Sequence, residues 1–130
     1  MNDKLEELKT RLAEIVDLTN AAAILSWDMQ TYMPPGATEA RAAQLTTLRK
    51  LAHERLVADE VGRLLDDLAK DTADLDHDSF EASLVRVTRR ARDRQVKLPT
   101  DLVARTSRAQ ALGHAAWEKA RAASDFSIFR

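Results

Sequence analysis

The sequence predicts an all-α fold, a bundle of about five helices with a long N-terminal helix and no sheet. Three observations lead to this class. Ala, Leu, Arg, Glu and Asp are abundant, only three glycines and three prolines interrupt 130 residues, and apolar residues recur at spacings of three and four. At this length we expect residues 1–130 to form a single domain.

The first helix is expected over Asp3–Trp27. Its inward face is a seam of apolar and small residues at alternating spacings of three and four, as in coiled coils. The seam consists of Leu5, Leu8, Leu12, Ile15, Thr19, Ala22 and Ser26. After Asn20 the sequence AAAIL is apolar on nearly every side, which predicts that neighbours enclose this half of the helix.

Pro34, Pro35 and Gly36 stop the first helix, because proline lacks an amide hydrogen and restricts the residue before it. Thr38 is the expected N-cap of a second helix. A third helix is expected from Asp59 to Lys70. The inward residues of the two helices are Ala42, Leu45, Leu48, Ala52 and Leu56, with Leu51 at the edge, and then Val61, Leu64, Leu65 and Leu68.

A polar connector, DTADLDHD, leads to a fourth helix that Asp78 and Glu81 open with a capping-box-like pattern. Pro99 ends this helix, and Thr100 or Asp101 caps a fifth helix that runs to about Ala123. The expected inward residues are Phe80, Leu84, Val87, Ala91 and Leu98 in the fourth helix, and Leu102, Thr106, Ala109, Gly113, Ala116, Trp117 and Ala120 in the fifth.

The small residues of the fifth helix, Gly113 among them, predict that another helix approaches closely. Ser124 or Asp125 starts one more turn. Its large apolar residues Phe126, Ile128 and Phe129 either fold back onto the bundle or begin a further helix.

Composition argues against several classes of function. The net charge of −1 gives no global field for nucleic acid or acidic membrane, and cysteine is absent, which removes disulfides and thiolate chemistry. The basic run from Arg86 to Lys97 has no interleaved aromatics for base stacking and is interpreted as a solvated face or as the contact for an acidic partner helix. No stretch is apolar over a bilayer's width and the N-terminus has no signal core, so we expect a cytoplasmic protein without a nucleic-acid or membrane partner.

His53-Glu54 is similar to the start of the zinc-protease motif, but the motif needs a second histidine where Val57 stands. His77 and His114 have no spacing that joins them to a site, so all three histidines are expected at the surface. The adjacent carboxylates Asp66-Asp67 and Glu6-Glu7 point apart on a helix and are interpreted as solvated. No Gly-x-Ser-x-Gly elbow or glycine-rich phosphate loop occurs.

The segment SWDMQTYMPPG gathers Trp27, Met29, Tyr32 and Met33 around the proline break. In the favoured interpretation Trp27 fills the core while Asp28 accepts hydrogen bonds from backbone amides of the following turn. In the alternative, the segment is the wall of a groove, since Trp, Tyr and Met suit peptide contacts.

The same segment carries a family resemblance. LSWDMQTYMPPG, followed by EARAAQLTTLRKLAHE, resembles the opening of the carboxypeptidase Taq family of metallocarboxypeptidases, and the similarity continues in KLPTDLV (97–103) and AWEKARAASDFSIF (116–129). The residues that match the family pattern are Trp27, Asp28, Thr31, Met33, Pro34, Arg41, Leu98, Pro99, Trp117, Ala120, Asp125, Phe126 and Phe129.

The resemblance implies an almost wholly helical enzyme, several times longer than this chain, that removes C-terminal amino acids from peptides with bound zinc or cobalt. Family members commonly form homodimers, and their N-terminal helices line or cover one side of the substrate groove. Their metal ligands, a His-Glu-x-x-His pair and a later glutamate, lie in the second half of the protein. No residue here matches them, so no catalytic, metal or cofactor role is assigned within residues 1–130.

The resemblance therefore predicts an N-terminal region that serves as groove wall, lid or dimer contact and is inactive alone. Its partners would be a second copy or the missing catalytic half, and peptide only in the intact enzyme. Trp27, Asp28, Thr31, Met33, Pro34 and Arg41 are the candidates for bordering the groove or locking the turn. The alternative is a stand-alone helical module that self-associates through the seam of the first helix.

Overall fold

The computed structural model describes all 130 residues, which form helices and no strands. The elements are α1 (Asn2–Thr31), the 3₁₀ turn η1 (Pro35–Ala37), α2 (Thr38–Val57), α3 (Asp59–Asp71), α4 (Phe80–Gln95), α5 (Thr100–Ala123) and the 3₁₀ turn η2 (Phe126–Ile128). The predicted all-α class, the five helices and the long first helix are confirmed.

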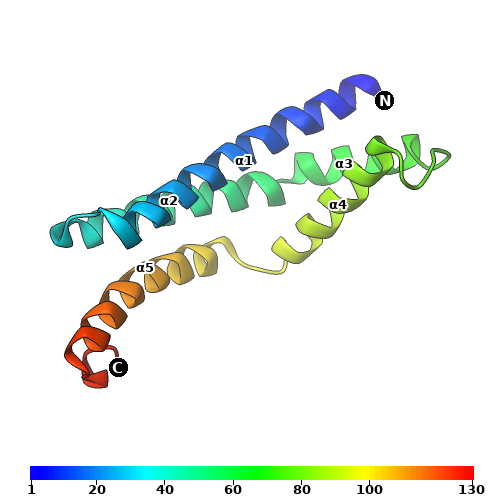
Figure 1. Cartoon of the computed structure of the whole chain (residues 1–130). Coiled ribbons are helices and arrows are strands. Elements are labelled where there is room, and N and C mark those ends of the chain that lie inside the picture. The colour runs from blue at the N-terminus through cyan, green and yellow to red at the C-terminus, as the bar shows by residue number, and fades with distance from the viewer.

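The helices form an elongated, open arrangement (Figure 1). α1 and α2 make an antiparallel hairpin, α5 lies along α2, and α3 and α4 make a second hairpin at the other end of the molecule. The amino terminus lies beside the end of α3, where the Met1 α-amino nitrogen is 3.8 Å from Asp71 Oδ2. The carboxyl terminus lies at the opposite end, next to the last turns of α5.

The first chain break falls at Pro34 as predicted, but the helices on either side differ from prediction. α1 continues four residues past Trp27, to Thr31. Thr38 is not an N-cap: it is the first residue of α2, with helical φ −56° and ψ −48°. The reason is that η1 runs directly into α2, so no extended residue precedes the helix for a hydroxyl to cap. The Thr38 hydroxyl donates instead to the Pro35 carbonyl, at 3.3 Å.

The other helix ends show where capping patterns succeed. Asp125 caps η2 as predicted, since its Oδ1 accepts from the Ser127 amide at 3.0 Å. The cap of α4 is Ser79, whose hydroxyl oxygen accepts from the Ala82 amide, and not Asp78 one residue earlier. α5 spans the predicted residues but has Pro99 in the N-cap position and no side-chain cap, so Thr100 and Asp101 are not caps.

The buried apolar residues form two separate clusters. An α1–α3–α4 cluster contains Leu5, Leu8, Val61, Leu64, Leu65, Leu68 and Val85. An α1–α2–α5 cluster contains Ala22, Ala42, Leu45 and Ala111, with Leu25, Met29, Leu48 and Leu112 packed against it. The predicted inward stripe of α3 is confirmed at all four positions, and the seam of α1 contributes buried residues to both clusters.

The predicted inward stripe of α4 is confirmed only at Leu84, which is half-buried and packs against the α1–α3–α4 cluster, and is wrong elsewhere. Phe80 and Val87 are 61% and 63% exposed, and Ala91 and Leu98 are also at the surface. The buried residues of α4 are its neighbours Val85 and Thr88, roughly a quarter-turn around the helix.

Polar anchors explain how α4 is rotated. Arg89 Nη2 donates to Asp66 Oδ1 of α3 at 2.7 Å. Arg92 Nη2 donates to the carbonyl of Val57 at 3.0 Å, at the junction of α2 and α3. Both arginines therefore face inward, and α4 presents the side with Val85 to α3 while Phe80 and Val87 remain exposed.

α5 and the second half of α1 are also more open than predicted. In α5 the buried residues are Ser107, Ala111 and Ala120, and a side chain placed at Gly113 would meet no atom within 4 Å, so no helix approaches there. The remaining stripe residues that lie at the surface are Leu102, Thr106, Ala109 and Trp117. Ile24 in the AAAIL run of α1 is 66% exposed, so neighbours do not enclose that half.

The accessible surface is large for the mass. It measures 8536 Å², whereas a folded monomeric protein of 14.5 kDa exposes about 6,900 Å² by the usual scaling of surface with mass. The accessible surface exceeds the expected value because only 16 of 130 residues are buried. None of the helices combines the length and the apolar character needed to cross a bilayer.

Candidate functional site

The α1–α2 corner, residues 25–41, is held by one arginine. Arg41 Nη1 donates to the Leu25 carbonyl at 2.7 Å, and Nη2 donates to Asp28 Oδ2 at 2.9 Å. Its Nε also donates to Gln44 Oε1 at 3.2 Å. The Arg41 side chain is 13% exposed and that of Asp28 is 32% exposed, so this ion pair is better shielded than those elsewhere on the surface. The planar guanidinium thus joins the end of α1 to the start of α2.

Two predictions for this corner are wrong. Trp27 does not fill the core: it is 58% exposed, with its ring edge-to-face with Tyr32 at 5.6 Å between centroids. Asp28 does not cap the following turn with its side chain. Because α1 continues to Thr31, the amides of Tyr32 and Met33 already donate to the Asp28 carbonyl, and the carboxylate is left for Arg41.

The remaining family-matched residues of the corner have local roles. The Thr31 hydroxyl donates to the Trp27 carbonyl at 2.9 Å. Met33 is half-buried, and Pro34 is exposed with the predicted extended backbone, φ −61° and ψ 144°. The structure therefore brings Asp28 and Arg41 together and leaves Trp27 and Tyr32 as an exposed aromatic pair.

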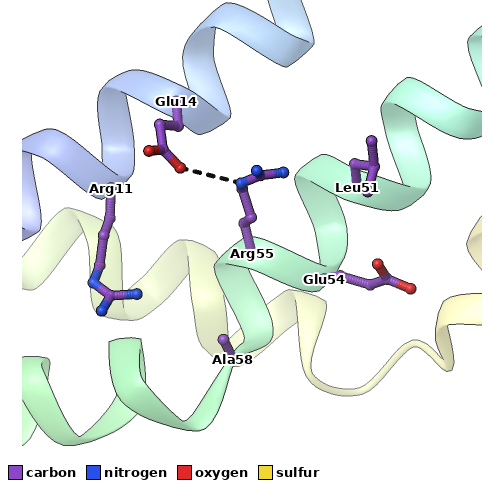
Figure 2. A pocket seen from close by; sticks show the side chains of 6 residues that line it. All are labelled: Arg11, Glu14, Leu51, Glu54, Arg55 and Ala58. Carbon is purple, nitrogen blue, oxygen red and sulfur yellow. Dashed lines mark hydrogen bonds and ion pairs between the residues drawn. The ribbon is translucent and has the colours of Figure 1, made fainter.

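His53 and Glu54 face different cavities, as expected for neighbours on a helix, which point about 100° apart. His53 is only 6% exposed, so its prediction as a surface histidine is wrong. Its Nδ1 lies 3.1 Å from Gln95 Oε1. Glu54 lines a separate cavity of about 250 Å³ between α1 and α2, beside the ion pair of Arg55 Nε with Glu14 Oε2 at 3.1 Å (Figure 2).

The other titratable candidates stay apart. His77 lies exposed in the connection between α3 and α4, and His114 lies half-buried on α5 with its Nε2 3.3 Å from Glu118 Oε1. Asp66 and Asp67 are exposed, as predicted, and each pairs with a basic residue of another helix. No three His, Asp or Glu side chains are grouped so that they could hold a metal ion.

The largest hollow is a central cavity of about 610 Å³ formed by α1, α2, α4 and the start of α5. It is lined by Ile15, Thr19, Ala22, Ala23, Arg49, Ala52, His53, Leu56, Ala91, Arg94, Gln95 and Val103. Arg49 ties three helices together beside it: Nη1 donates to Ser107 Oγ of α5 at 3.2 Å and Nη2 to Ser26 Oγ of α1 at 3.1 Å.

Sequence reasoning missed the central cavity and its polar residues. The available signal was a cation, Arg49, placed four residues after the buried Leu45 and four before His53, on the inward side of α2. A charged residue inside an apolar stripe indicates a specific polar contact, because an unpaired buried charge is costly.

The fold and the site define an all-helical scaffold whose polar side chains join helices and line cavities between them, without a grouped set of metal ligands. Comparison with known proteins then gives the family. The model of the carboxypeptidase Taq (M32) metallopeptidase family matches residues 7–130, and the chain belongs to this family.

Three curated relatives support the assignment. The chain is 29% identical over 116 residues to thermostable carboxypeptidase 1 of Thermus thermophilus, which covers 89% of this chain and 23% of the relative. It is 28% identical over 132 residues to thermostable carboxypeptidase 1 of Pyrococcus furiosus, a match that covers 98% of this chain and 25% of the relative. Carboxypeptidase 1 of Bacillus subtilis is 29% identical over 122 residues, a match that covers 91% of this chain and 23% of the relative. The chain thus spans about a quarter of their length, and no solved structure matches it.

Proposed function

We propose that the chain is the N-terminal helical region of a metal-dependent carboxypeptidase that removes C-terminal amino acids from peptides. In that enzyme it would act as wall or lid of the substrate groove or as a dimer contact, and it would be inactive alone. The family membership and the quarter-length coverage of the relatives support this proposal.

The observation that carries the proposal is the excess surface. The chain exposes about 1,600 Å² more than a compact protein of its mass. One partner in a standard protein–protein interface loses about 800 Å², so the excess equals the contribution to a large, obligate interface. A chain that folds against further protein would leave this surface open when taken by itself.

The composition of the exposed surface supports the same role. Trp27 and Tyr32 at the α1–α2 corner, Phe80 and Val87 on α4, and Phe126 in η2 are each more than half exposed. Exposed apolar side chains at these three places support contacts with further protein. In the proposed enzyme the aromatic pair of the corner would border the peptide groove, held in place by the Asp28–Arg41 ion pair.

The proposed chemistry resides in protein beyond these residues. A zinc or cobalt ion bound by a His-Glu-x-x-His helix would polarise the scissile carbonyl and activate water. We expect the 130-residue chain to show no carboxypeptidase turnover with added zinc or cobalt. Specific turnover that survives repurification would overturn the inactivity part of the proposal. The family role itself is tested by the gene: the reading frame should continue past Arg130 into a His-Glu-x-x-His sequence.

Self-association is expected of the chain in isolation, because the exposed apolar residues need cover. In the alternative, stand-alone module, the seam of α1 would offer only its less buried residues to a second copy, since Leu5, Leu8 and Ala22 are buried within the chain. Light scattering at increasing concentration should show dimers or larger species, with the Phe126→Ser, Phe129→Ser double variant shifted toward monomer. A clean monomer at high concentration would contradict this expectation.

A further inference from the structure

We propose that the central cavity is a binding site for the carboxylate of a small apolar acid, with Arg49 and Arg94 as its cationic partners. This inference goes beyond the groove-wall role and does not depend on it. It rests on the cavity's charge, its apolar walls and its size.

Arg49 is a half-buried cation without a counter-ion. Its two hydrogen bonds go to the neutral hydroxyls of Ser26 and Ser107, and no carboxylate lies within ion-pair distance of it. A guanidinium has five N–H donors, so three remain without a protein acceptor. Half-buried charges are normally paired, and an anion in the cavity would supply the missing partner.

Exposed Arg94 and buried His53 also line the cavity. Arg94 lines the cavity and makes no hydrogen bond or ion pair within the chain, and no Asp or Glu is among the twelve lining residues. His53 is more than nine-tenths buried, and its Nε2 has no hydrogen-bond partner. The cavity therefore presents two guanidinium groups and an imidazole with no negative charge among them.

The hydrophobic residues that line the cavity determine which anions fit it. Seven of the twelve lining residues are hydrophobic, among them Ile15, Leu56 and Val103. The volume of about 610 Å³ lies within the range of small-molecule sites. An arginine fork matches a planar carboxylate, whereas the apolar walls offer nothing to the hydration shell of inorganic phosphate. A carboxylate attached to an apolar body satisfies both parts of the site.

The first test is calorimetric titration of the 130-residue chain with 4-phenylbutyrate, with 4-phenylbutanamide as the neutral isostere and inorganic phosphate as the polar anion. We expect the acid to bind with a Kd of about 1 mM or tighter, and the amide and phosphate at least about tenfold more weakly. Equal binding of acid and amide, or no binding of the acid at ten times that concentration, would overturn the proposal.

Two matched variants locate the site. Arg94→Met should weaken binding of the acid about tenfold, because it removes a charged donor at an exposed position where folding is unaffected. Arg90→Met removes another exposed arginine of α4, one that does not line the cavity, and this variant should bind the acid as the parent does. If both variants bind alike, the acid binds elsewhere and the assignment fails.

A spectroscopic measurement gives a readout independent of affinity. With ¹⁵N-labelled histidine, the acid should shift the ring nitrogens of His53, in the cavity wall, and leave those of the exposed His77 unchanged. Comparable shifts at His77, or none at His53 under saturating acid, would place the ligand outside the cavity and refute the inference.

Discussion

Replacing Arg41 with Met tests whether one guanidinium holds the α1–α2 corner. Methionine keeps most of the apolar stem and removes the charge, so the change isolates the three hydrogen bonds to Leu25, Asp28 and Gln44. The variant leaves the Asp28 carboxylate without its partner in a position that is one-third exposed.

The expected loss of stability follows from that geometry. A hydrogen bond to a charged group contributes about 1.5–3 kcal/mol when shielded and less when solvent competes for it. With Arg41 shielded and Asp28 partly exposed, we expect Arg41→Met to cost about 2–3 kcal/mol. At about 4 °C per kcal/mol for a chain of this size, Tm should fall by about 8–12 °C.

The assay is thermal and urea unfolding followed by circular dichroism at 222 nm. The matched control is Arg55→Met, which breaks another α1–α2 ion pair, between side chains 46% and 59% exposed. Solvent screening should limit that loss to under about 1 kcal/mol. If Arg41→Met costs no more than Arg55→Met, the corner is not held by its arginine and the reasoning is refuted.

Three further predictions follow from burial and hydrogen bonding. Leu65→Ala, at a side chain with 0% exposure in the α1–α3–α4 cluster, should cost about 3–4 kcal/mol in urea unfolding; a loss below about 1 kcal/mol would show that the site collapses freely. Gly113→Ala should stabilise the chain by about 0.5–1 kcal/mol, because the added methyl meets no neighbour and improves helix propensity; destabilisation would mean that a partner contacts this face. The hydroxyl and then the amide of Ser127 lower the pKa of Asp125, so NMR titration should place its midpoint below the ordinary aspartate value, and Ser127→Ala should raise it. A depressed pKa in the folded state stabilises η2 above the ordinary aspartate pKa and ceases to do so as pH falls through the lowered value.

The helices and their breaks could be predicted because their causes are local. A proline follows the ends of α1 and α4 within a few residues, and apolar spacing identifies α3 with its full inward stripe. The rotation of α4 could not be predicted, since Phe80 and Val87 look like core residues until a neighbour is shown to be absent. Periodicity identifies the apolar side of a helix, but only tertiary structure shows whether that side is covered.

The candidate site shows the same limit. The family pattern selected Asp28 and Arg41, which the structure joins. The capping role that the segment around the proline break predicted for Asp28 is removed by the longer α1. The central cavity depends on Arg49 and His53 of α2 and on Gln95 of α4, which is far from them in sequence. Long-range pairs of this kind carry no mark in one sequence beyond a charge in an apolar stripe.

The separation of the two buried clusters has a consequence for how the chain responds to damage. Leu5 and Leu8 pack one end of α1 into the first cluster and Ala22 packs the other end into the second, so the helix connects two independent packing sites. Substituted residues in different clusters share no neighbours, so their losses of unfolding free energy should add. Each end of α1 can also open locally while the other stays packed. Local opening rather than global unfolding should therefore determine the rate of amide hydrogen exchange along α1.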